Sequence, residues 1–278
     1  MLIISLSVLS NSRSYGAEEE IANFVFGDSN VDVGNNDYIV SLAKANNVPY
    51  GIDYGGPTGR FTNGRTIVDI LDLAQTLGKF GQSPPYLAPT TKGSVILKGV
   101  NYASGGAGIL NETGSVFRLY NMGAKKILVT NVGVIGCIPY ERKLNLCLGN
   151  QCAANPNQLA QSYNVKLKSL LTELNNNLKG SNFVYGDTYG TFNEVIYHYQ
   201  SYGFENVNSP CCSNNPWDKS GSLLLCSPSA SVCCDRSKYA FWDPFHPTEA
   251  TNMIIAKRLI DGNISYISPI NIRQLLNS

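Results

Sequence analysis

The sequence has little charge of either sign. Only 15% of the 278 residues are charged, and the formal net charge is +1. A protein that binds nucleic acid needs a basic field to attract phosphates, so this composition argues against a nucleic-acid partner. The chain also has no internal repeat and no low-complexity tract. Its length and its 43% of hydrophobic residues suit one globular domain with a sizeable core.

Long apolar runs are missing as well. Apart from Leu2 to Leu9, nothing approaches the ~18 consecutive apolar residues that a membrane helix needs, so no integral membrane segment is expected. Small polar residues follow that run, and Ser14-Tyr15-Gly16 offers a cleavage site before Ala17. This order is typical of a secretory signal peptide. We expect a short leader over residues 1–16 and one domain over 17–278, with a disordered extension as the alternative for the leader.

Cysteine is present in an even number. An even count in an exported chain predicts disulfides, although the pairing cannot be read from the sequence. Zinc ligands are usually separated by two or more residues, which excludes a zinc site at the adjacent pairs Cys211-Cys212 and Cys233-Cys234. Asn111 and Asn263 begin sequons that would carry glycans after export.

Alternating strand and helix patterns predict an α/β fold with a parallel, doubly wound sheet. The strands are expected at residues 24–26, 95–102, 126–132 and 182–187, and helices at residues 66–77, 159–178 and 247–260. A further helix is expected over residues 36–44. Residues 210–234 are expected to form a loop pinned by cysteines.

Ser29 lies where the first expected strand stops. The apolar run Phe24-Val25-Phe26 is broken by Gly27-Asp28-Ser29. Open α/β sheets place their ligands at such strand ends, so Ser29 is a candidate nucleophile. A turn-forming or helix-capping serine is the alternative. Asp28 and Asp32 flank Ser29 and are expected to hold its loop.

His246 is the candidate base for this serine. Histidine is scarce, and His198 is the second of two. A serine nucleophile needs an adjacent base, and that base needs a third group to orient it. Asp243 precedes His246 by three residues and can supply that group, while Pro247 suits the first position of the next helix. His198, between Tyr197 and Tyr199, is expected to pack among aromatic residues rather than to act in catalysis, and Asp187 is the runner-up acid.

Several blocks together resemble the plant GDSL esterase/lipase family of SGNH hydrolases. They are Phe26-Gly27-Asp28-Ser29, Asn101-Tyr102-Ala103-Ser104-Gly105-Gly106, Gly136-Cys137-Ile138-Pro139, Cys211-Cys212 and Asp243-x-x-His246. The resemblance runs from about Asn23 to Asn277 in consistent order. It implies a three-layer, flavodoxin-like α/β/α fold, and hydrolysis of an acyl ester by Ser29, His246 and Asp243 without metal or cofactor.

The resemblance also implies backbone donors for an oxyanion. These are Ser29 N–H and the N–H of Gly105 or Gly106, with Gly105 preferred. The family's third donor is the asparagine of a Gly-x-Asn-Asp block, which this chain lacks between Gly108 and Lys126. A parallel crossover needs a dozen or more residues, usually with a helix. Residues 105–125 number only 21, and the first ten are loop-like, so we expect a missing segment between the second and third expected strands.

We therefore expect a secreted serine esterase, located in the cell wall or apoplast. Its substrate would be an acyl ester of a lipid or an acetylated cell-wall sugar, and acyl transfer to another alcohol stays open. The alternatives are a truncated, catalytically impaired family member and a secreted lipid- or carbohydrate-binding protein. The sequence leaves the oligomeric state open.

Overall fold

A five-stranded sheet in the order β2-β1-β3-β4-β9 forms the centre of the fold. This computed structural model describes residues 4–9, 21–76, 82–107, 125–214 and 224–278. The strands are β1 (Ile4–Leu9), β2 (Ile21–Phe26), β3 (Lys126–Thr130), β4 (Asn182–Gly186) and β9 (Ile267–Ser268). β3 and β4 are parallel, whereas β1 is antiparallel to β2 and β3, and β9 is antiparallel to β4.

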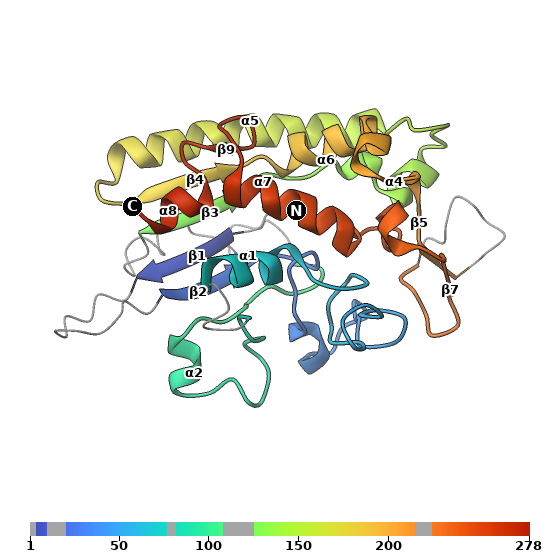
Figure 1. Cartoon of the computed structure of the whole chain (residues 1–278), viewed down its shortest axis with the longest axis horizontal. Helices are drawn as coiled ribbons and strands as arrows, with labels where there is room; N and C mark the ends of the chain where they lie inside the picture. The colour runs from blue at the N-terminus through green and yellow to red at the C-terminus, as the bar shows by residue number, and fades with distance from the viewer. Residues whose placement is uncertain (1–3, 10–20, 77–81, 108–124, 215–223) are drawn as a thin grey trace.

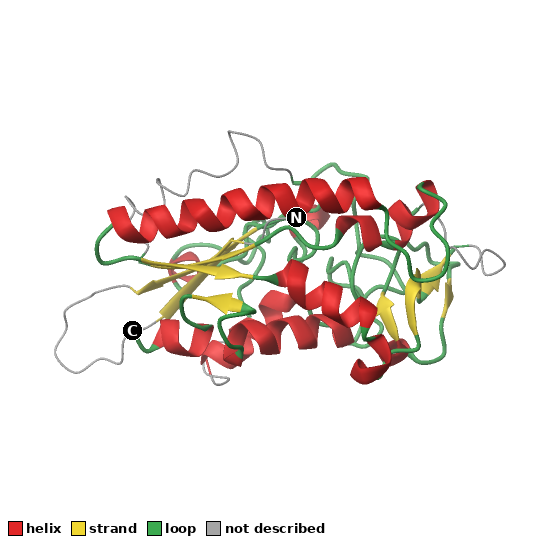
Figure 2. Ribbon diagram, turned by 90° about the horizontal axis from the view of Figure 1, so that it is seen from above, coloured by secondary structure: helices red, strands yellow, loops and turns green. Residues whose placement is uncertain are grey.

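Helices cover both faces of the sheet (Figures 1 and 2). Side chains alternate between the two faces of a strand, and β3 and β4 are apolar on both. On one face, Ile127, Val129, Phe183 and Tyr185 pack with leucines of α5 (Ala154–Asn177). On the other, Leu128 and Val184 pack with residues of α1 (Ile67–Thr76), α6 (Thr188–Tyr197) and α7 (Glu249–Asp261). The expected α/β class and its three layers are confirmed.

Shorter elements surround the sheet. Two parallel strands, β5 (Asn206–Pro210) and β8 (Tyr239–Phe241), and two antiparallel strands, β6 (Cys212–Ser213) and β7 (Ser231–Val232), lie at one end of the molecule (Figure 1). The short helices are α2 (Ser94–Leu97), α4 (Pro139–Leu144) and α8 (Ile272–Leu276). Short 3₁₀ turns are η1 (Asn35–Tyr38), η2 (Ile135–Cys137), η3 (Tyr199–Tyr202) and η4 (Arg236–Lys238).

The strand expected at residues 95–102 is wrong. Residues 94–97 form the single turn α2, and only Asn101 bridges to Val25 and Pro85. Gly99 explains the difference, since its φ of +104° is not a strand conformation. Its backbone also lies so close to Asn23 that a Cβ would be 2.3 Å from the Asn23 oxygen.

Two expected helix starts are also wrong. Residues 35–38 form only the 3₁₀ turn η1, and no α-helix occupies residues 36–44, all of which are described. The last helix begins at Glu249, and Thr248 caps it by accepting a hydrogen bond from Thr251 N–H. Pro247 therefore precedes the cap rather than opening the helix.

Strand β1 comes from the segment that the sequence analysis assigns to a leader. In the structure of the whole chain it lies between β2 and β3, with Ile4 opposite both Phe26 and Val129. The sequence predicts a sheet that lacks a segment between its second and third strands. In the structure, the N-terminal strand β1 lies between β2 and β3 instead.

Disulfides pin the loop at residues 210–234, as expected. Cys211 pairs with Cys233 and Cys212 with Cys226, and a third bridge joins Cys137 to Cys152. Cys147 and Cys234 are free thiols. Among the described residues, no helix is long and apolar enough to cross a membrane.

Candidate active site

Ser29 opens the turn that follows β2. The turn is closed by Val31 N–H and Asp32 N–H, which both donate to the Asp28 carbonyl, at 3.2 and 3.1 Å. The Asp28 side chain accepts from Asn30 N–H at 3.0 Å. These bonds leave the half-buried Ser29 side chain at the carboxyl end of the strand.

A tight loop carries Asp243 and His246. Trp242 N–H donates to the His246 carbonyl at 2.8 Å and closes the loop between β8 and α7. Within it, Asp243 Oδ1 accepts from the backbone amides of Phe245 and His246, both at 2.8 Å. The aspartate side chain thus fixes the backbone that presents the histidine.

Ser29, His246 and Asp243 form one line of hydrogen bonds. His246 Nε2 lies 2.8 Å from Ser29 Oγ, and His246 Nδ1 lies 2.8 Å from both carboxylate oxygens of Asp243. Because a carboxylate only accepts, Nδ1 carries the proton and Nε2 is free to accept from the serine hydroxyl. The structure therefore brings the three predicted residues together in the order expected for a nucleophile, a base and an orienting acid.

The site excludes water from its acid and base. Asp243 is fully buried and His246 is 4% exposed. Phe61 packs against the imidazole, with ring centroids 5.0 Å apart, and Phe245 lies on its edge at 6.0 Å. A buried charge is stabilised only when donors surround it, so the hydrogen bonds to Asp243 matter more here than they would at the surface.

An apolar cavity of about 200 Å³ opens beside Ser29 and His246. Its walls come from α1, α6, α7 and the segment after β3, and its apolar lining includes Ile67, Val134, Ile138, Phe192, Phe245 and Ile255. Only Ser29, Asn30, Thr188 and His246 bring polar side chains to it. Such a cavity suits an apolar group placed next to the serine.

The glycine-rich loop lies against the serine turn. Ser104 N–H donates to the Gly27 carbonyl at 3.1 Å, and a turn follows in which Ala107 N–H donates back to Ser104. The third residue of this turn is Gly106, and its φ of +85° needs glycine. The loop therefore approaches the strand end, as the resemblance implies.

The Gly105 amide is already engaged. It donates to Asp32 Oδ2 at 2.9 Å, so in this conformation it is not free to bind an oxyanion. Burial raises the pKa of the Asp32 carboxyl, while the amides of Gly34, Gly105 and Asn35 oppose that rise. Gly106 is exposed, and its N–H has no acceptor among the described residues.

Two adjacent asparagines, Asn35 and Asn36, join the segment after Ser29 to the glycine-rich loop, and the sequence alone did not indicate this role. Asn35 Nδ2 donates to the carbonyls of Asn101 and Ala103 at 2.7 and 2.9 Å. Asn36 Nδ2 donates to the Gly105 carbonyl at 2.8 Å. The pair follows Gly34 directly in the sequence, but a single sequence does not show that adjacent asparagines bridge two distant loops.

The weaker candidates lie elsewhere. Asp187 caps α6 by accepting from Gly190 N–H at 2.8 Å, and it also accepts from Asn131 Nδ2 at 2.7 Å. His198 ends α6 and is exposed, so its expected packing among aromatic residues is wrong. Asn111, the first sequon asparagine, lies outside the described residues.

Comparisons with known proteins agree on one family. A family model described as GDSL-like lipase/acylhydrolase matches residues 114–259, which include Asp243 and His246. A GDSL esterase/lipase of Arabidopsis thaliana is 47% identical, over 99% of this chain and 96% of its own. A second from the same plant is 38% identical, over 91% and 87%, and GDSL esterase/lipase 7 is 33% identical, over 99% and 97%.

These alignments are longer than the chain. The first runs over 358 positions, whereas this chain has 278 residues, so at least 80 of the aligned positions are gaps in this chain. This total number of gapped positions agrees with the missing segment expected from the sequence. Residues 108–124, where the sequence analysis places the loss, lie outside the described residues.

Proposed function

This chain belongs to the family of GDSL-like lipases and acylhydrolases, and from that premise we propose that it hydrolyses carboxylic esters with Ser29 as its nucleophile. The observation that carries the proposal is the line of hydrogen bonds from Ser29 Oγ through His246 to Asp243. Activation of a serine requires this arrangement of base and orienting acid.

The reaction proceeds through an acyl-enzyme. Ser29 Oγ attacks the ester carbonyl carbon while His246 Nε2 takes the hydroxyl proton, and Asp243 stabilises the imidazolium that forms. His246 then gives this proton to the leaving alcohol as the tetrahedral intermediate collapses. Water attacks the acyl-Ser29 ester by the same route, releasing the acid and restoring the serine hydroxyl.

Backbone amides stabilise the oxyanion in this proposal. Ser29 N–H has no acceptor among the described residues and is the first donor. Gly106 N–H is the second, because the amide of Gly105, which the sequence analysis preferred, donates to Asp32. Each donor to a developing oxyanion is worth roughly 10²–10³ in rate.

We propose that the acyl group of the substrate occupies the apolar cavity. Its volume is about 200 Å³ and its lining is mostly apolar. An acetyl group would leave most of this space empty. The cavity therefore favours esters of longer acyl chains, as found in lipids, over acetylated sugars.

Export of the protein is also proposed. The support is the three disulfides together with the exposed Asn263 of the second sequon. Disulfides form and persist in oxidising compartments. In a plant cell the proposal places the enzyme in the apoplast or cell wall.

A slow or inactive enzyme is the second candidate. The observation in its favour is the absence of a Gly-x-Asn-Asp block between Gly108 and Lys126, together with the gap of at least 80 positions. Losing one oxyanion donor would cost ~2.7–4 kcal/mol at the transition state. The two candidates share a fold and differ in turnover.

Hydrolysis of p-nitrophenyl esters by the purified chain tests the proposal. We expect the octanoate to have a higher kcat/KM than the acetate, and Ser29→Ala to lower kcat by roughly 10⁴-fold or more. Ser169→Ala, at an exposed serine on α5, is the matched control and should leave activity unchanged. Activity of Ser29→Ala at the parent level would remove Ser29 from the mechanism. A folded parent without turnover would favour the second candidate.

A further inference from the structure

A tyrosine far from Asp243 in the sequence donates to its carboxylate. Tyr50 Oη lies 2.8 Å from Asp243 Oδ2, across a separation of 193 residues. Both side chains are fully buried. The Tyr50 ring packs edge-on against Phe61 at 6.2 Å and Trp242 at 6.1 Å between ring centroids. These ring contacts hold the Tyr50 hydroxyl in place against the Asp243 carboxylate.

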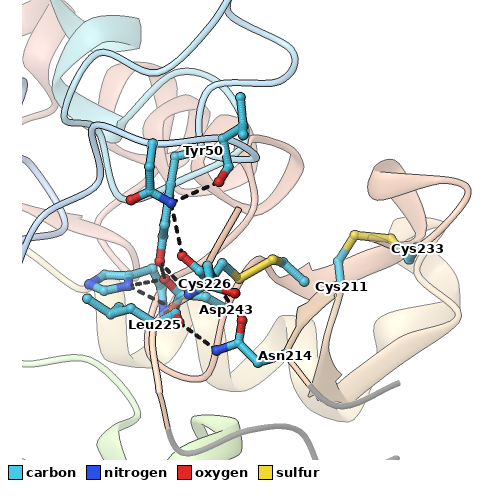
Figure 3. The surroundings of a disulfide bond; sticks show 12 residues. Tyr50, Cys211, Asn214, Leu225, Cys226, Cys233 and Asp243 are labelled. Carbon is cyan, nitrogen blue, oxygen red and sulfur yellow. Dashed lines mark hydrogen bonds and ion pairs between the residues drawn. A yellow bond between two sulfur atoms is a disulfide. The ribbon is translucent and has the colours of Figure 1, made fainter. Parts of the chain in front are cut away.

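The direction of this hydrogen bond is fixed by a third group. Cys226 N–H donates to Tyr50 Oη at 3.2 Å, which turns the hydroxyl proton toward Asp243. Burial and then the Asp243 carboxylate raise the pKa of Tyr50 far above its ordinary value, so the hydroxyl keeps the proton that it donates. Figure 3 shows Tyr50 reaching between Cys226 and Asp243.

Cys226 is itself held on several sides. Its sulfur is bonded to Cys212, and its carbonyl accepts from Asn47 Nδ2 at 3.2 Å. The Asn214 side chain clamps the flanking residues, because it donates to the Leu225 carbonyl at 2.7 Å and accepts from Ser227 N–H at 2.8 Å. The bridge Cys211–Cys233 lies to one side (Figure 3), and it makes no hydrogen bond to Tyr50 among the described residues.

We propose that Tyr50 is a positioning residue of the proposed esterase: its hydroxyl fixes the Asp243 carboxylate that orients His246, and the Cys212–Cys226 disulfide keeps that hydroxyl in place. The inference rests on the proposed function for its effect on turnover. Its geometric part concerns only Tyr50, Asp243 and His246.

The hydroxyl also sets how strongly Asp243 attracts the imidazole. The carboxylate has four donors, namely Tyr50 Oη, His246 Nδ1 and the amides of Phe245 and His246. Tyr50 and His246 are the ionisable side chains that contact Asp243 in the described part of the chain, and Ser29, Phe61 and Phe245 are the side chains against His246. Without the Tyr50 donor, more of the negative charge faces the imidazole, which then holds its proton to higher pH.

Tyr50→Phe isolates this effect, because it removes the hydroxyl and keeps the ring. We expect kcat/KM to fall about ten- to a hundredfold, because the loss of a hydrogen bond to a charged group has an effect of this size. The acid limb of the pH profile should move to higher pH. Tyr266→Phe is the matched control, since it removes a hydroxyl that donates to Glu194 at 3.0 Å, outside the site.

A readout that needs no turnover separates this inference from the proposed function. The chain has two histidines, so an NMR titration of the imidazoles gives one signal from His246 and one from the exposed His198 as an internal standard. In Tyr50→Phe the His246 midpoint should rise while that of His198 stays. If Ser29→Ala shows that the proposed function is wrong, this titration still decides whether Tyr50 acts on His246.

The disulfide is tested by the same titration. Replacing Cys212 and Cys226 together by serine should move the His246 midpoint in the same direction as Tyr50→Phe. Replacing Cys211 and Cys233 together is the control in the same loop and should not move it. The cysteine variants also test the inference if Tyr50→Phe does not fold. Unchanged His246 midpoints and an unchanged acid limb in both Tyr50→Phe and the Cys212/Cys226 variant would overturn the inference.

Discussion

Asp243 and His246 work as a buried pair because each polar atom of the aspartate has a donor. Backbone amides of its own loop reach Oδ1, and the hydroxyl of Tyr50 reaches Oδ2. The local donors follow from the short spacing between Asp243 and His246, which is why the sequence points to this pair. Tyr50 could not be found that way, because its partner is brought to it only by the folded chain.

The buried carboxyl of Asp72 makes the stability of the fold depend on pH. Burial raises the pKa of this carboxyl from 3.8 to about 6, although Ser83 N–H and the Asn23 side chain donate to it. The folded state therefore binds the Asp72 proton more tightly than the unfolded state does. The stabilising contribution is present below about pH 4 and is lost as the pH rises through about 6.

Asp72→Asn removes this titration. The free energy of unfolding of the variant, relative to the parent, should increase between pH 4 and 7 by up to about 3 kcal/mol, which is what ~2 pKa units are worth. Urea unfolding of both proteins at several pH values measures the change. A constant offset from rearranged hydrogen bonds cancels in this comparison, so a difference that does not vary with pH would contradict the assignment.

The helices α1, α5 and α7 and the buried strands β3 and β4 are the elements that periodicity predicts well. Leucines at helical spacing specify α5, and continuous Ile, Leu and Val specify β3. The strand expected at residues 95–102 failed because of one backbone position, Gly99, whose conformation depends on its contact with Asn23. Strand β1 was not expected because its apolar run is equally typical of a leader.

If residues 1–16 are a leader, the mature protein lacks β1, whereas a chain that keeps them keeps this strand. Removal of residues 1–16 would take β1 away and leave the facing edges of β2 and β3 without it. Unpaired strand edges lower stability and promote association. We expect a chain that starts at Ala17 to have a lower Tm than the full chain.

Calorimetry on both chains tests this prediction, and the intact mass from a secretory host shows which one is exported. A chain starting at Ala17 with the Tm of the full chain would show that β1 does not support the sheet.

The whole molecule combines a family site with a shortened chain. Its relatives align along almost their full length, yet at least 80 aligned positions have no counterpart in this chain. The sequence predicted the loss from the absent Gly-x-Asn-Asp block and from the short connection left between two blocks, which has room for about one short helical piece. It could not predict what lies beside β2 in the absence of that segment, because β1 pairs through its backbone, and backbone pairing leaves no motif.

The most direct measurement of the central claim is covalent labelling of the purified full chain with a fluorophosphonate, followed by peptide mapping. The probe reacts with a serine only when a base activates it, so it reports on the Ser29–His246 pair whatever the natural substrate is. We predict one adduct, on Ser29, that is lost in His246→Gln and kept in His198→Gln. Absence of an adduct on the folded chain, or an adduct that persists in His246→Gln, would contradict the account.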